Sequence, residues 1–336
     1  MARTNKTKSD ALDTIKIIRD ASGALRFEHP YIFQKPTAVT IGTFDGVHLG
    51  HLALINDLKR ASAARNLASA VVTFDRSPLA TVRPGHPYSR LNSYREQITR
   101  LSAAAPDITF VLPFDRALSQ LNADDFAQQV VVDMLHARHM LLGYDHSFGH
   151  ASHYGTAPET EALGVRHGIS IERAAAACDP EGNAYSSTRI KTLLRRGALR
   201  EANQLLGYAY PLSGVVVGGR HLGRTLGYPT ANIELDNAHK LLPPNGVYAA
   251  RARIGNELYP GMLYIGNRPT MGDEEERSIE IHLFDRSEEL YDRYISIEIE
   301  AFVHPEHHFG GTEQLTQALQ AYEAEIRALL GCPRTE

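Results

Sequence analysis

The stretch Gly42-Thr-Phe-Asp-Gly-Val-His-Leu-Gly-His51 decides the fold of the first half of the chain. It follows the apolar run 38–41, and the run after it, 52–60, repeats apolar residues at helical spacing. The stretch is therefore expected to be a turn from a strand into a helix. Residues three apart share one face of a helix, so the rings of His48 and His51 are expected to point the same way from its N-terminus.

The composition of this turn is typical of a phosphate-binding site. A helix N-terminus carries unpaired N–H groups and the positive end of the helix dipole, and both attract phosphate. Gly42, Gly46 and Gly50 let the backbone turn tightly and come close to a ligand. The alternative is a plain connection with two surface histidines, which this combination of residues disfavours. We interpret the turn as a nucleotide-phosphate site.

The composition of the whole chain excludes several classes of protein. Its 336 residues suffice for about two domains, and 43% hydrophobic with 22% charged residues is ordinary for a soluble globular protein. A net charge of −4 argues against a nonspecific nucleic-acid binder. Cys178 and Cys332 lack CxxC spacing, which disfavours a disulfide framework or a thiolate zinc site and fits a reducing cytoplasm.

The start of the chain and its hydropathy predict no membrane association. The first ten residues are polar with no apolar core behind them, which excludes a secretory signal. No apolar run reaches the roughly 18 residues that a membrane-spanning helix needs. We expect residues 1–14 to be a disordered tail.

From about residue 36 to residue 197, short apolar runs alternate with helical patterns. Alternation of this kind implies a parallel sheet covered by helices on both faces. The double-histidine turn then lies at the carboxyl end of a strand, where open parallel sheets bind ligands. The expected strands are 38–41, 68–74, 108–114, 139–143 and 169–174, and the expected helices are 52–65, 91–103 and 123–138.

After residue 211 the helices between strands disappear, which predicts an antiparallel β-barrel or sandwich. A helical segment from Ser186 to Gly207 joins the halves, so we expect domains at 15–197 and 198–336. The expected strands are 212–217, 246–254, 261–265, 279–284 and 295–302. A closing helix is expected to pack on them through Leu315, Leu319, Tyr322, Ile326 and Leu329.

Residues 218–225 have the spacing of a phosphate-binding P-loop, with Arg224 in place of the usual lysine. A P-loop opens a helix, and Gly227 and Pro229 would break it, so we reject that interpretation. A basic, glycine-rich loop beside phosphates stays possible on other grounds.

In extended structure Thr230 and Asn232 share a face, and their neutral oxygens suit Mg²⁺ held otherwise by ATP phosphates and water. A proline-initiated turn has equal weight.

Two groups in the second half have a functional and a plain interpretation. Glu280 and His282 share one face of an expected strand, where a carboxylate could act as a general base, although the pattern alone favours a solvent face. The cluster of His304, Glu306 and the two histidines after it has no dependable metal-ligand spacing, so we favour a solvated loop.

Together these motifs resemble the prokaryotic bifunctional riboflavin kinase/FAD synthetase family. The resemblance runs from about residue 36 to residue 330. The 42–51 stretch fits any HxGH nucleotidyltransferase, whereas Gly223-Arg-Thr-Leu-Gly-Tyr-Pro-Thr-Ala-Asn232 is more specific to riboflavin kinases. Supporting stretches lie at 90–95, 111–115, 186–191, 245–248, 265–270 and 279–285.

The resemblance implies a Rossmann-like nucleotidyltransferase domain followed by a riboflavin kinase barrel with a closing helix. In the barrel, the 5′-hydroxyl of riboflavin would attack the γ-phosphate of ATP to give FMN. Glu280 would be the base, with Thr230 and Asn232 at the Mg²⁺–ATP site. In the first domain, the FMN phosphate would attack the α-phosphate of ATP to give FAD, with His48 and His51 steadying the phosphate charge.

The resemblance also implies further contacts and the partners of the protein. The partners would be riboflavin, FMN and ATP, with Mg²⁺ as cofactor. From the composition we expect a cytoplasmic protein that binds neither nucleic acid nor membrane, and self-association is left open. Nucleotide-binding candidates in the first half are Gly42, Phe44, Asp45, Gly46, Gly50, Asp145, Ser186, Ser187, Thr188, Arg189 and Lys191. In the second half they are Gly223, Arg224, Gly227, Pro229, Val247 and Tyr248, and the flavin-binding candidates are Arg268 and Thr270.

The first half departs from the family pattern at several positions. Lys191 replaces an arginine of the ISSTxIR motif, Ser77 replaces a histidine, and Ser147 replaces an arginine. The usual glycine and basic residues are missing from 151–154. These departures leave open a riboflavin kinase whose nucleotidyltransferase half has decayed or takes another nucleotide. A flavin store without turnover is the other alternative, against which the intact kinase motifs argue.

Overall fold

The computed structural model describes residues 13–144, 157–219, 222–268, 276–286 and 288–333. The chain forms two compact units, and each is described by itself. The first comprises Met1–Tyr88 and Gln97–Tyr185, and the second comprises Ser89–Glu96 and Ser186–Glu336. The second unit therefore includes a short segment that lies, in the sequence, within the first half.

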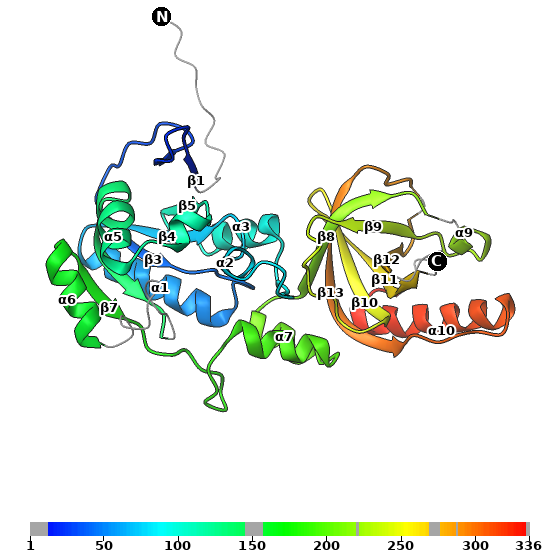
Figure 1. Ribbon diagram of the computed structural model, residues 1–336. Helices are drawn as coiled ribbons and strands as arrows, with labels where there is room; N and C mark the ends of the chain where they lie inside the picture. The colour runs from blue at the N-terminus through cyan, green and yellow to red at the C-terminus, as the bar shows by residue number, and fades with distance from the viewer. Residues whose placement is uncertain (1–12, 145–156, 220–221, 269–275, 287, 334–336) are drawn as a thin grey trace, which may run out of the picture. The chain divides into compact units, whose positions relative to one another are not determined.

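The first unit is built on a seven-stranded sheet in the order β2-β1-β5-β4-β3-β6-β7 (Figure 1). Its described strands pair in parallel, except that β1 and β2 are antiparallel. From β3 the chain adds β4 and β5 on one side and later β6 and β7 on the other, so the order reverses beside β3. Such a switch point is where open α/β sheets bind ligands. The strands are β1 (Asp13–Arg19), β2 (Leu25–Phe27), β3 (Thr37–Ile41), β4 (Ala68–Phe74), β5 (Ile108–Leu112), β6 (Ala137–Leu142) and β7 (Ser170–Arg173).

Helices cover both faces of this sheet, which confirms the expected α/β architecture. On one face, Ile41 packs in a cluster with Val130 of η1. On the other, Ala38 packs with Leu58 of α1 and Leu101 of α3. The helices are α1 (Leu49–Ala64), α2 (Pro78–Val82), α3 (Tyr94–Ala103), α4 (Arg116–Ser119), α5 (Ala123–Phe126), the π-helix η1 (Ala127–Met134) and α6 (Ala157–His167).

The first two strands were not expected from the sequence. β1 begins at Asp13, inside the stretch expected to be a tail, and pairs in parallel with β5. β5 itself ends at Leu112 and not at residue 114, because Pro113 cannot donate to a ladder. Asp115 then caps α4 by accepting a hydrogen bond from the backbone of Leu118 at 2.7 Å.

The helix expected at 123–138 is shorter and of mixed type. One turn of α-helix, α5, continues as the π-helix η1, which ends at Met134. The wider turn keeps Val130 and Leu135 buried. His136 has a φ of +50°, which ends the helix, and β6 begins at the next residue.

The second unit is a closed antiparallel barrel in the order β10-β11-β12-β9-β8-β13. Its interior is filled by alternate apolar residues such as Leu212, Ile265, Ile281 and Ile297, which are all fully buried. The expected barrel is thereby confirmed, with β9 as an additional strand. The strands are β8 (Tyr210–Val217), β9 (Ala231–Leu235), β10 (Gly246–Ile254), β11 (Glu257–Arg268), β12 (Glu276–Leu283) and β13 (Tyr294–Pro305).

The closing helix is α10 (Thr312–Leu330), and it packs on the outer face of the barrel. Ile326 lies in a buried cluster with Met262 of β11 and Phe284. Leu330, and not Leu329, completes the stripe, because Leu329 is 43% exposed.

The helical segment expected from Ser186 to Gly207 consists of α7 (Ser187–Arg195) and α8 (Leu199–Leu206). Gly197, with a φ of +76°, breaks it, and Gly207 ends α8 in the left-handed conformation, as expected. α9 (Leu222–Thr225) is a four-residue helix that stops before Gly227, so residues 218–225 do not open the long helix of a P-loop. Within the described ranges, no helix is both long and apolar enough to cross a membrane.

Candidate active sites

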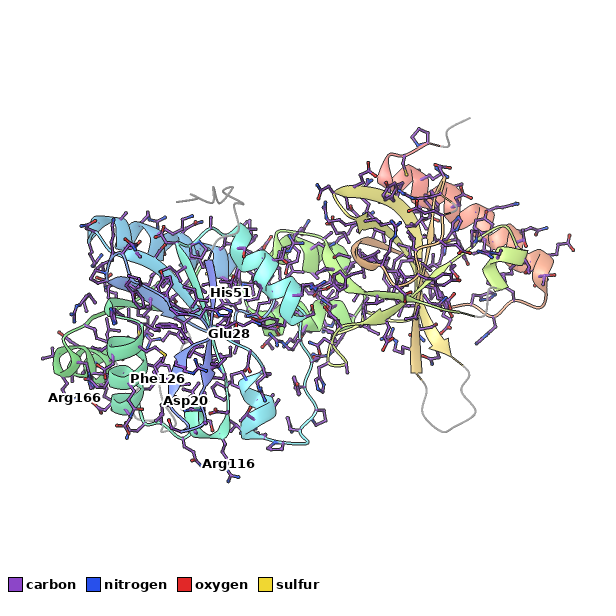
Figure 2. The ribbon with its side chains drawn as sticks, turned by 90° about the horizontal axis from the view of Figure 1, so that it is seen from above. Asp20, Glu28, His51, Arg116, Phe126 and Arg166 are labelled. Atoms are coloured by element: carbon purple, nitrogen blue, oxygen red, sulfur yellow. The ribbon has the colours of Figure 1, made fainter. Side chains whose placement is uncertain are left out.

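The double-histidine loop, residues 42–51, joins β3 to α1. His48 is the N-cap residue of α1, with extended backbone angles of −73° and 174°, and Figure 2 labels His51 in the first turn. The two rings stack with their centroids 3.7 Å apart, and the backbone N–H of His48 donates to Nδ1 of His51 at 3.3 Å. The helix starts at Leu49, three residues before the expected position, and both rings lie together at its N-terminus.

The backbone of this loop is strained and held by packing. Phe44 and Val47 have φ values of +45° and +35°, a region that a β-branched residue such as valine rarely enters. Both side chains are almost fully buried and pack in one cluster with Leu58 and Leu101. Strain of this kind persists where the surroundings over-determine it, and it gathers at functional sites.

Burial keeps both histidines neutral at neutral pH. Loss of solvent lowers the pKa of His48 to about 4, against a smaller opposing effect of Asp45. Burial, and then the neighbouring His48, hold the pKa of His51 well below its usual value. Among the described residues, Nδ1 of His48 has no hydrogen-bond partner, although the residue is only 4% exposed. A neutral imidazole donates one N–H, so the pair and the helix N-terminus can together present donors to an anion.

Glycine is required beside the histidines. A methyl group at Gly50 would lie 2.9 Å from Cβ of Tyr185 and 3.1 Å from Nδ1 of His48. At Gly42 it would meet the ring of Phe44 at 3.3 Å. The loop therefore packs too closely for a side chain at Gly50.

The other nucleotide-binding candidates of the first half lie in different parts of the chain. Asp45 and Gly46 are buried in the double-histidine loop. Asp145 lies outside the described residues. The ISSTxIR-like segment forms the start of α7 in the second unit, where Oγ of Ser186 caps the helix by accepting from the N–H of Arg189 at 3.2 Å. Ser187, Thr188, Arg189 and Lys191 follow in the first turns of that helix.

In the second unit the structure brings together three candidates that lie up to 50 residues apart. Asn232 of β9 is paired with Glu280 of β12, and Oγ1 of Thr230 donates to Oε2 of Glu280 at 3.1 Å. The pattern alone favoured a solvent face for Glu280. Instead the residue is half-buried on the barrel face that carries α10, and His282 on the same face contacts the carbonyl of Pro229 at 2.8 Å.

The glycine-rich loop before this site lies against it. A methyl group at Gly219 would overlap the side-chain amide of Asn232. Gly227 has a φ of +80°, which turns the chain toward Pro229. Arg224 is exposed and pairs with Glu289 at 3.4 Å.

A tyrosine that the sequence patterns did not single out borders the same site. Tyr264 of β11 is paired with Glu280 across the strands, and its hydroxyl donates to Glu306. Burial raises the pKa of Tyr264, and Glu306 adds to the effect. Glu306 also accepts a hydrogen bond from Asn245 at 2.9 Å. The only sequence signal for Tyr264 is its position in a strand next to Glu280.

The remaining candidates are two residues of β10, Tyr248 and Val247, and the flavin-binding pair Arg268 and Thr270. The ring of Tyr248 is fully buried in the barrel and its hydroxyl donates to the carbonyl of Pro244. Val247 packs in the cluster under α10. Arg268 ends β11, with its side chain outside the described part, and Thr270 lies outside the described residues.

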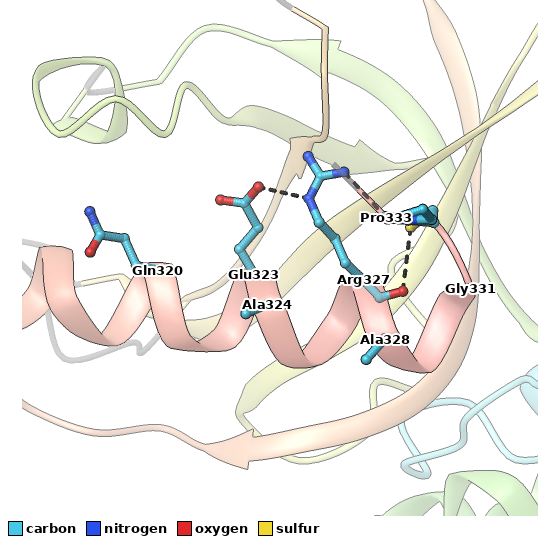
Figure 3. Close-up of a pocket in the computed structure, with 8 residues that line it drawn as sticks. Gln320, Glu323, Ala324, Arg327, Ala328, Gly331 and Pro333 are labelled. Atoms are coloured by element: carbon cyan, nitrogen blue, oxygen red, sulfur yellow. Dashed lines mark hydrogen bonds and ion pairs between the residues drawn. The ribbon is translucent and has the colours of Figure 1, made fainter. Parts of the chain in front are cut away.

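A pocket of about 740 Å³ lies on the flank of α10 (Figure 3). In its wall, Glu323 accepts a hydrogen bond from Nε of Arg327 at 2.8 Å, and Arg327 also pairs with Asp285 at 2.8 Å. The hydroxyl of Tyr228 donates to Glu323 at 3.0 Å, which ties the pocket wall to the residue before Pro229. The lining residues are Gln320, Glu323, Ala324, Arg327, Ala328, Gly331, Cys332 and Pro333.

Two family models match the two halves of the chain. The FAD synthetase model matches residues 32–189, and the riboflavin kinase model matches residues 206–330. The first range contains the double-histidine loop, and the second contains Thr230, Asn232 and Glu280.

Curated relatives match over most of their length. A protein of Listeria monocytogenes named bifunctional riboflavin kinase/FMN adenylyltransferase is 35% identical over 294 residues, which are 86% of this chain and 91% of the relative. The protein of the same name from Escherichia coli K12 is 32% identical over 299 residues, 89% of this chain and 94% of the relative. A crystal structure from Streptococcus pneumoniae, described as a macrolide-efflux protein, is 28% identical with a TM-score of 0.81 and covers 94% of this chain and 98% of its own.

Proposed function

The chain belongs to the bifunctional riboflavin kinase/FMN adenylyltransferase family, and from this premise we propose which residues perform its two reactions. The enzyme phosphorylates riboflavin to FMN with ATP and adenylylates FMN to FAD with ATP. We assign the adenylyltransferase to residues 15–197 and the kinase to residues 198–336. The efflux activity of the Streptococcus description has no counterpart in either family model or in the names of the two curated relatives.

For the kinase reaction we propose Glu280 as the general base. The contact of Glu280 with Thr230, beside Asn232, is the observation that carries this assignment. The carboxylate would take the proton of the riboflavin 5′-hydroxyl while the oxygen attacks the γ-phosphorus of ATP. The bond between that phosphorus and its bridging oxygen breaks, and ADP leaves.

The residues around Glu280 fit a magnesium ion. Thr230 and Asn232 offer a hydroxyl and an amide oxygen, which are hard ligands of the kind that Mg²⁺ takes together with water and phosphate. The bare backbone of Gly219 leaves room for the amide of Asn232, which a Cβ at that position would displace. We propose that these two side chains hold the ion, which when bound neutralises phosphate charge.

We propose the pocket on α10 as the place of the flavin ring. Its volume of about 740 Å³ lies within the range of about 300–1,000 Å³ of small-molecule sites. Tyr228 links its wall to Pro229 and so to the proposed metal ligands. Arg268 and Thr270 stay predicted flavin contacts.

For adenylyl transfer we propose the double-histidine loop as the site of the ATP phosphates. A phosphate oxygen of FMN would attack the α-phosphorus of ATP, and the bond to the β-phosphate breaks to release pyrophosphate. His48, His51 and the N–H groups that open α1 would donate to the oxygens on which charge builds.

The free Cys178 and Cys332 support the cytoplasm as the compartment.

Separate assays of the two steps test these assignments. Glu280→Gln is expected to lower FMN formation from riboflavin by about 100-fold or more and to leave FAD formation from FMN unchanged. Glu234→Gln, at an exposed position of neighbouring β9, is the matched control. His48→Ala combined with His51→Ala is expected to lower FAD formation by about 100-fold and to spare the kinase, with exposed His86→Ala as control. Wild-type rates in either variant would refute the corresponding assignment.

A further inference from the structure

A fully buried glutamine reaches the double-histidine loop from α3. Gln97 has no exposed surface. Its Nε2 donates to the carbonyl oxygen of Thr43 at 2.9 Å and to Oγ1 of Thr73 at 2.7 Å. An amide nitrogen carries two hydrogens, so each has an acceptor. Thr43 is the second residue of the loop, and Thr73 lies on β4, which pairs with β3.

The bond to Thr43 acts on the most strained part of the loop. The carbonyl of Thr43 and the nitrogen of Phe44 belong to one planar peptide group. Anchoring that carbonyl therefore fixes one side of the rotation that gives Phe44 its φ of +45°. A non-glycine residue held in the left-handed region is strained, so it needs such an anchor.

The same face of α3 makes a second, apolar contact with the loop. Leu101 lies four residues after Gln97, on the same side of the helix, and is fully buried. It packs in one cluster with Phe44 and Val47. A polar contact and an apolar contact from one helix face thus hold both left-handed residues of the loop.

We propose that Gln97 is a positioning residue for adenylyl transfer. By holding the peptide between Thr43 and Phe44, it keeps the loop in the conformation that presents His48 and the N-terminus of α1 to the phosphates. The inference rests on the proposed function of the double-histidine loop. Displacement of catalytic groups by about 1 Å can cost about 100-fold in rate, so loss of the anchor should act on turnover.

Gln97→Met tests the proposal, because methionine has a similar length and no donor. The turnover number for FAD formation is expected to fall about 10- to 100-fold, while the KM for ATP changes by less than about threefold. FMN formation by the same protein is expected to stay within about twofold of wild type, since the kinase residues lie in the other unit. Gln129→Met, at an exposed position of η1, is the matched control and should leave both activities unchanged.

Gln97→Glu separates positioning from a merely structural role. Its carboxylate has the shape of the amide but only accepts, whereas its protonated form donates one hydrogen bond. The FAD activity of this variant, divided by that of wild type at each pH, is expected to rise on acidification. Division by wild type removes the titration of the substrates and of the two histidines. The same ratio for Gln97→Met is expected to stay flat.

Two results would overturn the proposal. One is a turnover number for FAD formation within twofold of wild type in Gln97→Met. The other is an FAD activity of Gln97→Glu, divided by that of wild type, that does not change with pH. This second result decides if thermal unfolding shows that the first unit of Gln97→Met is no longer folded. If the double-histidine variant forms FAD normally, the site assignment fails. If that variant is impaired and Gln97→Met is not, the role of Gln97 alone fails.

Discussion

Gly219 shows how a residue without a side chain can control a catalytic group. The amide of Asn232 occupies the space that a Cβ at Gly219 would take, whereas none of the described residues lies within 4 Å of a methyl group at Gly218. Gly219→Ala is therefore expected to displace Asn232 and lower FMN formation about 10- to 100-fold, an effect typical of residues that support metal ligands. Titration of Mg²⁺ in the kinase assay measures it, with Gly218→Ala as control. Equal Mg²⁺ dependence in both variants would contradict the placement of the ion.

The buried histidines predict how stability depends on pH. In the unfolded chain His48 titrates near 6.5, and in the folded chain near 4, so the unfolded state binds more protons between these values. The contribution of His48 to the free energy of unfolding is therefore fully present above about pH 6.5. It is lost as the pH falls toward 4, which lowers the free energy of unfolding by about 3 kcal/mol. The lowered pKa of His51 acts in the same direction.

Thermal unfolding of wild type and of His48→Gln, at several pH values from about 8 to about 4.5, measures this dependence. The midpoint of wild type is expected to fall more steeply on acidification than that of the variant, because glutamine does not titrate. Parallel curves for the two proteins would show that His48 is not the group responsible.

At the residue scale, motifs confined to one segment were predictable and contacts between distant segments were not. The spacing of His48 and His51 predicted rings on one face of a helix, because three residues of helix separate them. The contact of Thr230 with Glu280 depends on the register of β9 against β12, which no local pattern reports. Gln97 gave no signal, since a polar residue on an amphipathic helix is expected to face solvent.

At the scale of elements, α10 joins the pocket wall to the kinase motif through buried charges. Arg327 and Glu323 are 7% and 6% exposed, and Arg327 also pairs with Asp285 after β12. Arg327→Met would leave two carboxylates without their cation, one of them buried, at a cost of about 3 kcal/mol or more in the free energy of unfolding.

Arg327→Met is therefore expected to destabilise the barrel and to lower FMN formation, while FAD formation from FMN stays unchanged. Glu325 lies on the same helix as Arg327 and is an exposed partner of His304. Glu325→Gln should lower the free energy of unfolding by less than about 1 kcal/mol. Thermal unfolding together with the two activity assays compares the variants. A stable Arg327→Met protein with a normal kinase rate would show that the network contributes little.

Element types were predictable where hydrophobic periodicity was strong, and element ends were not. Apolar runs with no helical pattern between them predicted the barrel strands, and the apolar stripe predicted α10, with an error of one residue at Leu329. β9 was missed because its apolar part is short and lies among polar residues. The end of η1 at Met134 depends on the left-handed His136, which sequence patterns do not report.

At the scale of the molecule, the two compact units lie close to the ranges that the two family models match. The second unit also takes in Ser89–Glu96, where Nζ of Lys240 pairs with Glu96 at 2.6 Å and donates to the carbonyl of Leu91 at 2.5 Å. The change from alternating helices and strands to strands alone predicted two folds. It could not predict this inserted segment, because a buried ion pair between residues 144 positions apart in the sequence leaves no local pattern.

All the named departures from the family pattern except Lys191 lie inside a recognised domain. The FAD synthetase match over residues 32–189 includes Ser77 and Ser147. Together with curated relatives that carry both activities in their name, this match favours an active first domain over a decayed one. The central claim is that each step has its own catalytic residues, His48 and His51 for adenylyl transfer and Glu280 for phosphorylation.

A mixing experiment tests that claim most directly. Glu280→Gln and the His48→Ala, His51→Ala variant are each incubated with riboflavin, ATP and Mg²⁺, alone and together, and the flavins are separated by chromatography over time. Alone, the first variant is expected to leave riboflavin unchanged and the second to stop at FMN, whereas the mixture makes FAD. FAD formation by either variant alone at the wild-type rate, or FMN that accumulates in the mixture without conversion, would contradict the account.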